Sequence, residues 1–150
     1  RNRAARPEKY VKVESRSSTL ASRSMALTGL TILVYLIYHL MHFTWGTAHA
    51  QHYAGQPGWE YTLKDGTVVP DVYRMVVASF HDPMITAVYL LAMVILGFHL
   101  NHAVASAFQT LGVTNGRFVP IIRLAGPLLG LAIAAGFMSV PLVIMAGLVH

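Results

Sequence analysis

Three long apolar segments constrain the fold of this chain more than any other feature. They cover residues 20–45, 84–111 and 118–149. An α-helix rises about 1.5 Å per residue and needs about 20 mainly apolar residues to cross the hydrocarbon core of a bilayer. Each segment is long enough, and none contains Asp or Glu. The sequence therefore predicts an all-α membrane protein, with three transmembrane helices in a single membrane domain over residues 1–150.

The polar stretch before the second apolar segment carries turn and capping signals. Asp65-Gly66 stands between two short strand-like stretches, which is typical of a hairpin. Asp71 precedes the amphipathic residues 72–80, which predict a short helix lying along the surface. Asp82 is followed directly by proline, a combination that favours the start of the second transmembrane helix. This stretch is therefore expected to contain short elements of its own.

The basic residues are concentrated at the amino-terminal end. Seven of the eleven Lys and Arg residues lie in the first 23 positions, and such residues mark the cytoplasmic side of membrane proteins. Residues 1–19 are therefore expected to be a basic cytoplasmic segment, residues 46–83 an outer loop, and the carboxy terminus is expected to lie outside. A basic arm is also found in nucleic-acid-binding proteins, but that interpretation leaves the apolar segments unexplained, so we expect no nucleic-acid partner.

Two of the apolar segments contain the same His-Leu-x-His pattern. His39 and His42 form the first pair, and His99 and His102 form the second. Ionisable residues inside membranes are costly and usually functional, and a neutral imidazole is a common ligand of haem iron. The chain has no cysteine, so iron–sulfur and zinc–thiolate sites are excluded within it. A packing role suits one isolated intramembrane histidine equally well, whereas proton relays usually recruit carboxylates, which these segments lack.

The expected depths of the two pairs differ. His39 follows the inner end of its helix, near Ala21, by a rise of about 27 Å. His102 follows the outer end of the next helix, near Pro83, by about 28 Å. The two histidines should therefore lie near opposite faces of the membrane and cannot ligate one haem. If both are ligands, two haems are present, and each takes its second axial ligand from a helix outside these 150 residues.

Several other residues are assigned secondary roles. His42 and His99 are the runners-up as haem ligands, and a packing or supporting role is favoured for each. Arg23, near the inner end of its helix, either pairs with a haem propionate or extends to the interface. Three loop histidines are expected to be solvated, with a place at the edge of a quinone pocket as the alternative: His49, His52 and His81. Three glycines of the last segment are expected to permit close helix packing: Gly126, Gly130 and Gly136.

These motifs together resemble the dihaem cytochrome b membrane anchors of succinate:quinone oxidoreductases, the succinate dehydrogenases and fumarate reductases. The resemblance covers nearly the whole chain. The stretches that carry it are Arg3-Ala4-Ala5-Arg6-Pro7 with Tyr10, Ser22-Arg23-Ser24-Met25 and Thr28-Gly29 before His39, His99-Leu100-Asn101-His102 with Ser106–Gly112, and Gly136-Phe137 with Pro141. The resemblance implies that these three helices belong to a five-helix bundle with two haems b. It also implies that His39 ligates the distal haem, near the outer face, and that His102 ligates the proximal haem.

The same resemblance implies a function. The chain would pass electrons between the iron–sulfur subunit of the complex and quinone, often menaquinone in such anchors, in a bacterial inner membrane. Succinate chemistry would belong to the flavoprotein subunit, because this chain carries no dicarboxylate site. The sequence begins at Arg1 rather than Met. We therefore expect the two remaining haem-ligating helices to precede it in a longer protein, with a separate polypeptide as the alternative.

Other functions compete with this interpretation. One is the cytochrome b subunit of a formate dehydrogenase or hydrogenase, against which the string from Phe108 to Gly112 argues. Another is a haem-free transporter or assembly protein whose histidines bind substrate or protons, and it predicts no visible absorbance. A third is a structural anchor with vestigial haem sites.

Overall fold

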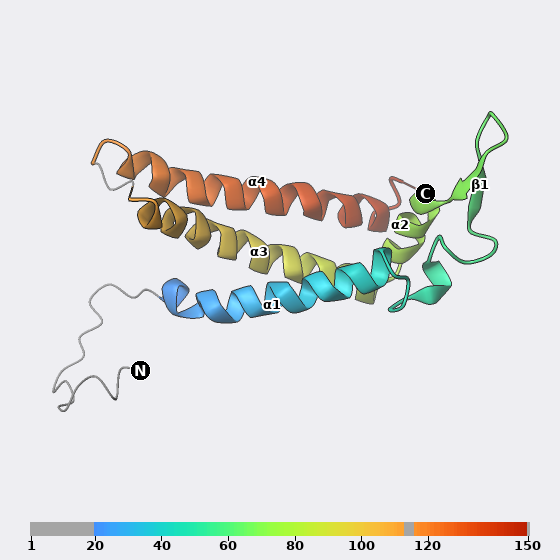
Figure 1. Cartoon of the computed structure of the whole chain (residues 1–150), viewed down its shortest axis with the longest axis horizontal. Helices are drawn as coiled ribbons and strands as arrows, with labels where there is room; N and C mark the ends of the chain where they lie inside the picture. The colour runs from blue at the N-terminus through green and yellow to red at the C-terminus, as the bar shows by residue number, and fades with distance from the viewer. Residues whose placement is uncertain (1–19, 113–115, 150) are drawn as a thin grey trace, which may run out of the picture.

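The computed structural model describes residues 20–112 and 116–149, except for the side chains of residues 20–23, 109 and 119. Three long helices run side by side along the molecule, and the short elements gather at one end of them (Figure 1). The helices are α1 (Leu20–Phe43), α3 (Pro83–Thr110) and α4 (Val119–Met145). All three are long and apolar enough to cross a membrane. The expected basic segment, residues 1–19, lies outside the described residues.

The helix ends agree with the sequence expectations to within a few residues and have local causes. α1 ends at Phe43 rather than at residue 45, because the chain turns through Gly46, whose φ is +66°. α4 ends at Met145 rather than at residue 149. The turn there passes through Gly147 with a φ of +71°, a left-handed conformation that commonly closes helices.

The predicted hairpin is confirmed. It consists of β1 (Glu60–Thr62) and β2 (Val68–Pro70), which pair antiparallel with Tyr61 opposite Val69. Gly66 supplies the positive φ of +85° at the tip. The Asp65 carboxylate accepts a hydrogen bond of 3.0 Å from the Thr67 backbone N–H. That bond holds the pKa of the exposed Asp65 carboxyl below its ordinary value.

The two predicted helix caps are also confirmed. Asp71 precedes α2 (Val72–Phe80), and its carboxylate accepts a bond of 2.9 Å from the Arg74 N–H. Asp82 precedes α3, and its carboxylate accepts bonds of 2.8 Å from the Met84 N–H and 3.2 Å from the Ile85 N–H. Each carboxylate satisfies N–H groups that the first turn of a helix leaves without partners.

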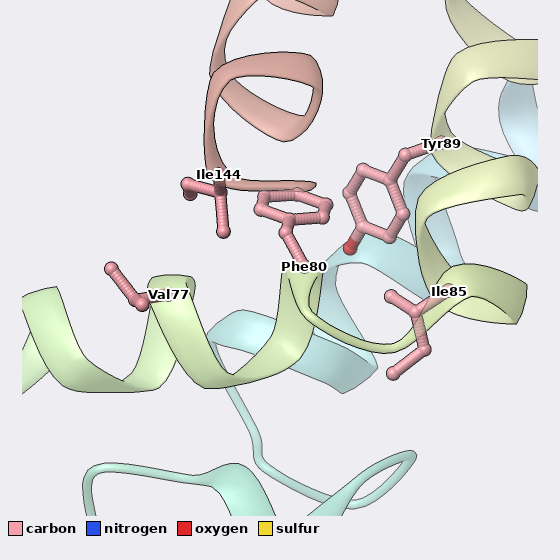
Figure 2. Close-up of a cluster of buried hydrophobic side chains, with 5 residues drawn as sticks. All are labelled: Val77, Phe80, Ile85, Tyr89 and Ile144. Atoms are coloured by element: carbon pink, nitrogen blue, oxygen red, sulfur yellow. The ribbon is translucent and has the colours of Figure 1, made fainter. Parts of the chain in front are cut away.

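The predicted amphipathic helix at residues 72–80 is present as α2, and it buries its apolar face. Its side chains Met75, Val77, Ser79 and Phe80 are buried. Figure 2 shows Val77 and Phe80 beside Ile144 of α4 and Tyr89 of α3, in a cluster of buried apolar side chains. α2 therefore covers the end of the helix bundle. A period-3.6 pattern indicates which face of a helix is apolar but not what that face meets.

Close backbone packing joins α3 to α4, as predicted for two of the three glycines. A Cβ atom at Gly130 would lie 2.5 Å from the backbone oxygen of Gly97. A Cβ atom at Gly126 would lie 2.5 Å from the backbone oxygen of Asn101. No described atom lies within 4 Å of a Cβ at Gly136, so this third glycine makes no close contact with the described helices. The contacts at Gly97, Asn101, Gly126 and Gly130 are called the glycine seam below.

α1 packs on α3 in an antiparallel register. Thr28 meets His99 near one end, and His39 meets Tyr89 near the other. Eleven residues separate the two α1 positions and ten separate the two α3 positions, which correspond to rises of about 16 and 15 Å. The equal spacing shows that the two helices stay in register over this distance. Most large apolar side chains of α1 face outward, with Leu27 67% and Val34 60% exposed, as lipid-facing or partner-facing side chains do.

Candidate functional site

His39 lies at the edge of a large apolar cavity. The cavity has a volume of about 500 Å³ and is lined by side chains from α1, α2, α3 and α4. Apart from His39, its only polar lining groups are the hydroxyls of Tyr35 and Tyr89. The volume falls within the range of about 300–1,000 Å³ that small-molecule and cofactor sites occupy. A half-buried imidazole is thus placed where it faces an apolar ligand space.

His42, one helical turn further along α1, is in a different situation. Its side chain is only 1% exposed, and both ring nitrogens have hydrogen-bond partners. Nδ1 lies 3.0 Å from the Tyr89 hydroxyl, and Nε2 lies 3.1 Å from the Ser79 hydroxyl. The ring also stacks on Phe43 at 4.0 Å between centroids. His42 therefore joins α1 to α2 and α3, and neither of its nitrogens is available to a metal in this arrangement.

Tyr89 connects the two histidines of the first pair. Its hydroxyl lies 3.0 Å from Nδ1 of His42 and 3.4 Å from Nδ1 of His39. Its ring packs edge-on against Phe80 (Figure 2), and the two ring centroids lie 5.0 Å apart. Nothing in the local pattern marks its hydroxyl as a partner of residues 47 and 50 positions away along the chain.

The second pair lies at the other end of the bundle. Nδ1 of His99 lies 3.0 Å from the Thr28 hydroxyl of α1. A Cβ at Gly29 would lie 3.3 Å from the His99 ring, so the glycine gives the imidazole room against α1. His99 is therefore a contact between α1 and α3, held through one ring nitrogen.

His102 faces a smaller cavity next to this contact. The cavity has a volume of about 210 Å³ and is lined by Ser24, Thr28, Phe98 and His102. The imidazole is half-buried and forms no hydrogen bond with any residue that the structure describes. This volume is below the usual range for cofactor sites, so the described helices provide only part of a site of that size.

The two cavity-facing histidines are far apart. His39 lies level with Tyr89 of α3, whereas His102 lies one turn beyond His99 and thus level with the first described turns of α1. The register of α1 and α3 separates them by about 20 Å along the bundle. A single metal ion or a single haem iron therefore cannot bind both. Within the described ranges no three His, Cys, Asp or Glu side chains gather into one metal-binding group.

The loop histidines differ from the expectation that all three are solvated. His49 is half-buried, and its Nε2 lies 2.9 Å from the Tyr38 hydroxyl. His52 has a buried Nδ1 without a hydrogen-bond partner among the described residues. Only His81 is exposed. The short elements fold back against α1, which the sequence did not predict. The Arg23 side chain, expected near a haem propionate or the interface, lies outside the described side chains.

No protein-family model, curated protein or solved structure matches this chain. The resemblance to dihaem cytochrome b anchors therefore rests on the sequence motifs, and what it implies remains a proposal.

Proposed function

We propose that this chain is a haem b-binding membrane anchor of a succinate:quinone oxidoreductase, in which it carries electrons between the iron–sulfur subunit and quinone. The observation that supports this most is the placement of His39 and His102. Each is half-buried in a helix apolar enough to cross a membrane, each lines a cavity, and the two lie about 20 Å apart along the bundle. Two redox centres at different depths would use this arrangement to move electrons through the membrane.

The residues around His39 fit a bound haem. Neutral imidazole is a usual axial ligand of haem b, and the cavity wall is apolar on all four contributing helices. Nε2 of His39 forms no hydrogen bond with a residue in the described ranges, whereas Nδ1 has Tyr89. Ligation through one ring nitrogen with a hydrogen bond to the other is the common arrangement for metal-bound histidine. His39 would hold the iron, and the surrounding apolar side chains would exclude water.

At the other end, His102 is the ligand that we propose, and the fit is partial. Its ring faces the cavity, but that cavity is small and lined by few described side chains. We propose that two further helices, from the same protein or another chain, complete both sites and supply the second axial ligands. They would produce the five-helix bundle that the resemblance implies, against the iron–sulfur and flavoprotein subunits. Bound haem b supplies a one-electron carrier at each end.

The lack of acidic groups supports electron transfer over proton transport. The three apolar segments contain no Asp or Glu, and proton relays through membranes usually depend on them. The basic residues concentrated in the first 23 positions favour a cytoplasmic location for that end, by the positive-inside rule. His39 then lies near the outer face of a bacterial inner membrane, and His102 lies near the cytoplasmic face, where the iron–sulfur subunit would dock.

The deciding experiment is a reduced-minus-oxidised optical spectrum of the purified complex, with haem counted per chain. Two haems b per chain would support the proposal. A complex without haem would contradict it and would leave the histidines as proton or substrate ligands. Succinate-dependent reduction of the haem distinguishes this complex from a formate dehydrogenase or hydrogenase cytochrome, which would respond to formate or hydrogen instead.

A further inference from the structure

We propose that Tyr89 is a positioning residue: held by His42 and Ser79, it keeps the proton of His39 on Nδ1 and leaves the Nε2 lone pair to a ligand in the cavity. This inference rests on the proposed function only in naming that ligand as haem iron. The hydrogen-bonded chain itself follows from distances between described atoms. It runs from Met75 of α2 through these three side chains to His39.

Ser79 determines which group donates and which accepts along this series of hydrogen bonds. Its hydroxyl oxygen lies 2.7 Å from the backbone oxygen of Met75. A carbonyl oxygen carries no proton, and two oxygens this close require a proton between them. The single hydroxyl proton of Ser79 is therefore donated to Met75. The Ser79 oxygen can then only accept, so Nε2 of His42 carries a proton and donates it across 3.1 Å.

The state of His42 follows from its burial. The side chain is 1% exposed, and none of its described hydrogen-bond partners is a carboxylate. A buried cation without a counter-charge is costly, so the ring is neutral and carries one proton. Because that proton lies on Nε2, Nδ1 must accept. The Tyr89 hydroxyl therefore donates its only proton to His42 across 3.0 Å.

His39 is the last member of the chain. The Tyr89 oxygen has given its proton to His42, so it can only accept from Nδ1 of His39, which lies 3.4 Å away. Neutral His39 then has its proton on Nδ1 and a lone pair on Nε2. That is the form in which an imidazole ligates iron through Nε2. An acceptor on Nδ1 also raises the basicity of the ligating nitrogen.

Tyr89→Phe tests the chain by removing one oxygen while keeping the ring that packs on Phe80. Loss of the acceptor should weaken haem binding at the His39 end about tenfold. It should also raise the midpoint potential of that haem, because a less basic ligand stabilises ferric iron less. The second haem should keep both properties. Unchanged affinity and potential at the His39 end would overturn the proposal.

Tyr38→Phe is the matched control. It removes a hydroxyl of the same kind that is hydrogen-bonded to a histidine, but the partner is His49 at 2.9 Å rather than His39. Both haems should keep their affinities and potentials in this variant. A shift as large as that of Tyr89→Phe would show that any lost tyrosine hydroxyl in this region has the effect, and the proposal would be wrong.

Ser79→Ala tests the first hydrogen bond of the series and leaves Tyr89 and His39 unchanged. It leaves the Nε2–H of His42 without its acceptor, so the direction of the chain is no longer imposed. The potential of the haem at the His39 end should rise, by less than in Tyr89→Phe. A shift in the opposite direction would contradict the order of donors derived above.

A measurement on the proton itself separates this inference from the proposed function. Nitrogen spectra of the purified protein with isotope-labelled histidine report which ring nitrogen of His39 is protonated, whether or not haem is present. We expect Nδ1 in the unaltered protein and a mixture of both forms in Tyr89→Phe. A proton on Nε2 of His39 in the unaltered protein would overturn the inference. A complex without haem but with His39 protonated on Nδ1 would contradict only the proposed function.

Discussion

The two ends of the helix bundle hold α3 in different ways. At the His39 end, large side chains and hydrogen bonds join α3 to α1 and α2, through Tyr89, His42 and Ser79. Towards the His102 end, the glycine seam brings the backbones of α3 and α4 into direct contact. There the described link between α3 and α1 is the pair Thr28–His99.

This difference shows which candidate ligand the chain orients by itself. Nδ1 of His39 lies 3.4 Å from the Tyr89 hydroxyl, and the ring lies at a cavity with walls from four helices. His102 has no described hydrogen-bond partner and a smaller cavity. We infer that the His39 end carries most of its own site, whereas the His102 end depends on elements outside this chain. Haem occupancy after isolation should therefore be more robust at the His39 end.

The largest expected effect comes from removing each ligand in turn. His39→Ala and His102→Ala should each remove a different haem and leave about half of the haem absorbance. The optical spectrum and the midpoint potential of the remaining haem identify which one is lost. His81→Ala, at an exposed loop histidine, is the control and should retain both haems. Loss of the same haem in both variants would show that the two ends do not hold separate sites.

A substitution in the glycine seam should destabilise the protein by about 1–3 kcal/mol. Gly130→Ala places a Cβ 2.5 Å from the Gly97 backbone oxygen, which cannot move without moving α3. Gly136→Ala makes the same chemical change where nothing lies within 4 Å, and it should be nearly neutral. Thermal unfolding in detergent compares them. Equal melting temperatures would mean that the seam does not hold the His102 end together.

Hydrogen-bond deletions should have unequal effects at the two ends. Ser79→Ala leaves a donor of fully buried His42 without a partner and should cost about 1–3 kcal/mol. Thr28→Val removes the oxygen facing His99, which is half-buried, and should cost about 1 kcal/mol. Unfolding in denaturant measures both. A larger loss of unfolding free energy for Thr28→Val than for Ser79→Ala would contradict the inference that hydrogen bonds hold the His39 end more firmly.

The smallest expected effect is a local response of the hairpin to acid. The folded turn lowers the pKa of Asp65 from its ordinary value of 3.8. The stabilisation is therefore present above pH 3.8 and is lost as the pH falls through the lowered pKa. Exchange of the Thr67 amide proton should accelerate only in that acidic range, relative to the other hairpin amides. Asp65→Asn should abolish the pH dependence, and acceleration near neutral pH would assign it to another group.

Much of the fold was predictable because its signals are local. Segment length and hydropathy predicted the three long helices, and Asp65-Gly66, Asp71 and Asp82 predicted the hairpin and both caps. These features depend on residues within a few positions of each other, so a linear pattern contains them. The same reasoning could not decide which glycines meet a neighbour: Gly126 and Gly130 do, and Gly136 meets none among the described helices, because a glycine permits close packing without showing whether a helix faces it.

The candidate site was predictable only in part. The repeated His-Leu-x-His pattern indicated the two histidine pairs and their different depths. It did not indicate that Ser79 and Tyr89 would meet His42, since these residues are 37 and 47 positions away from it. Nor did it show that His49 would fold back onto Tyr38. Such contacts depend on how α2 crosses the end of the bundle, which is a tertiary property.

The glycine seam has a consequence for how the protein assembles in a membrane. Only eight residues separate the end of α3 from the start of α4 in the sequence, so the contacts between these two helices are local. In the glycine seam the backbones meet directly, and no long side chain has to be ordered first. α1 is separated from α3 by residues 44–82. We expect the α3–α4 hairpin to form early as a rigid unit and α1 to dock onto it later. His39 would then become oriented only in the last step, when the partner side chains of α1 and α2 meet Tyr89.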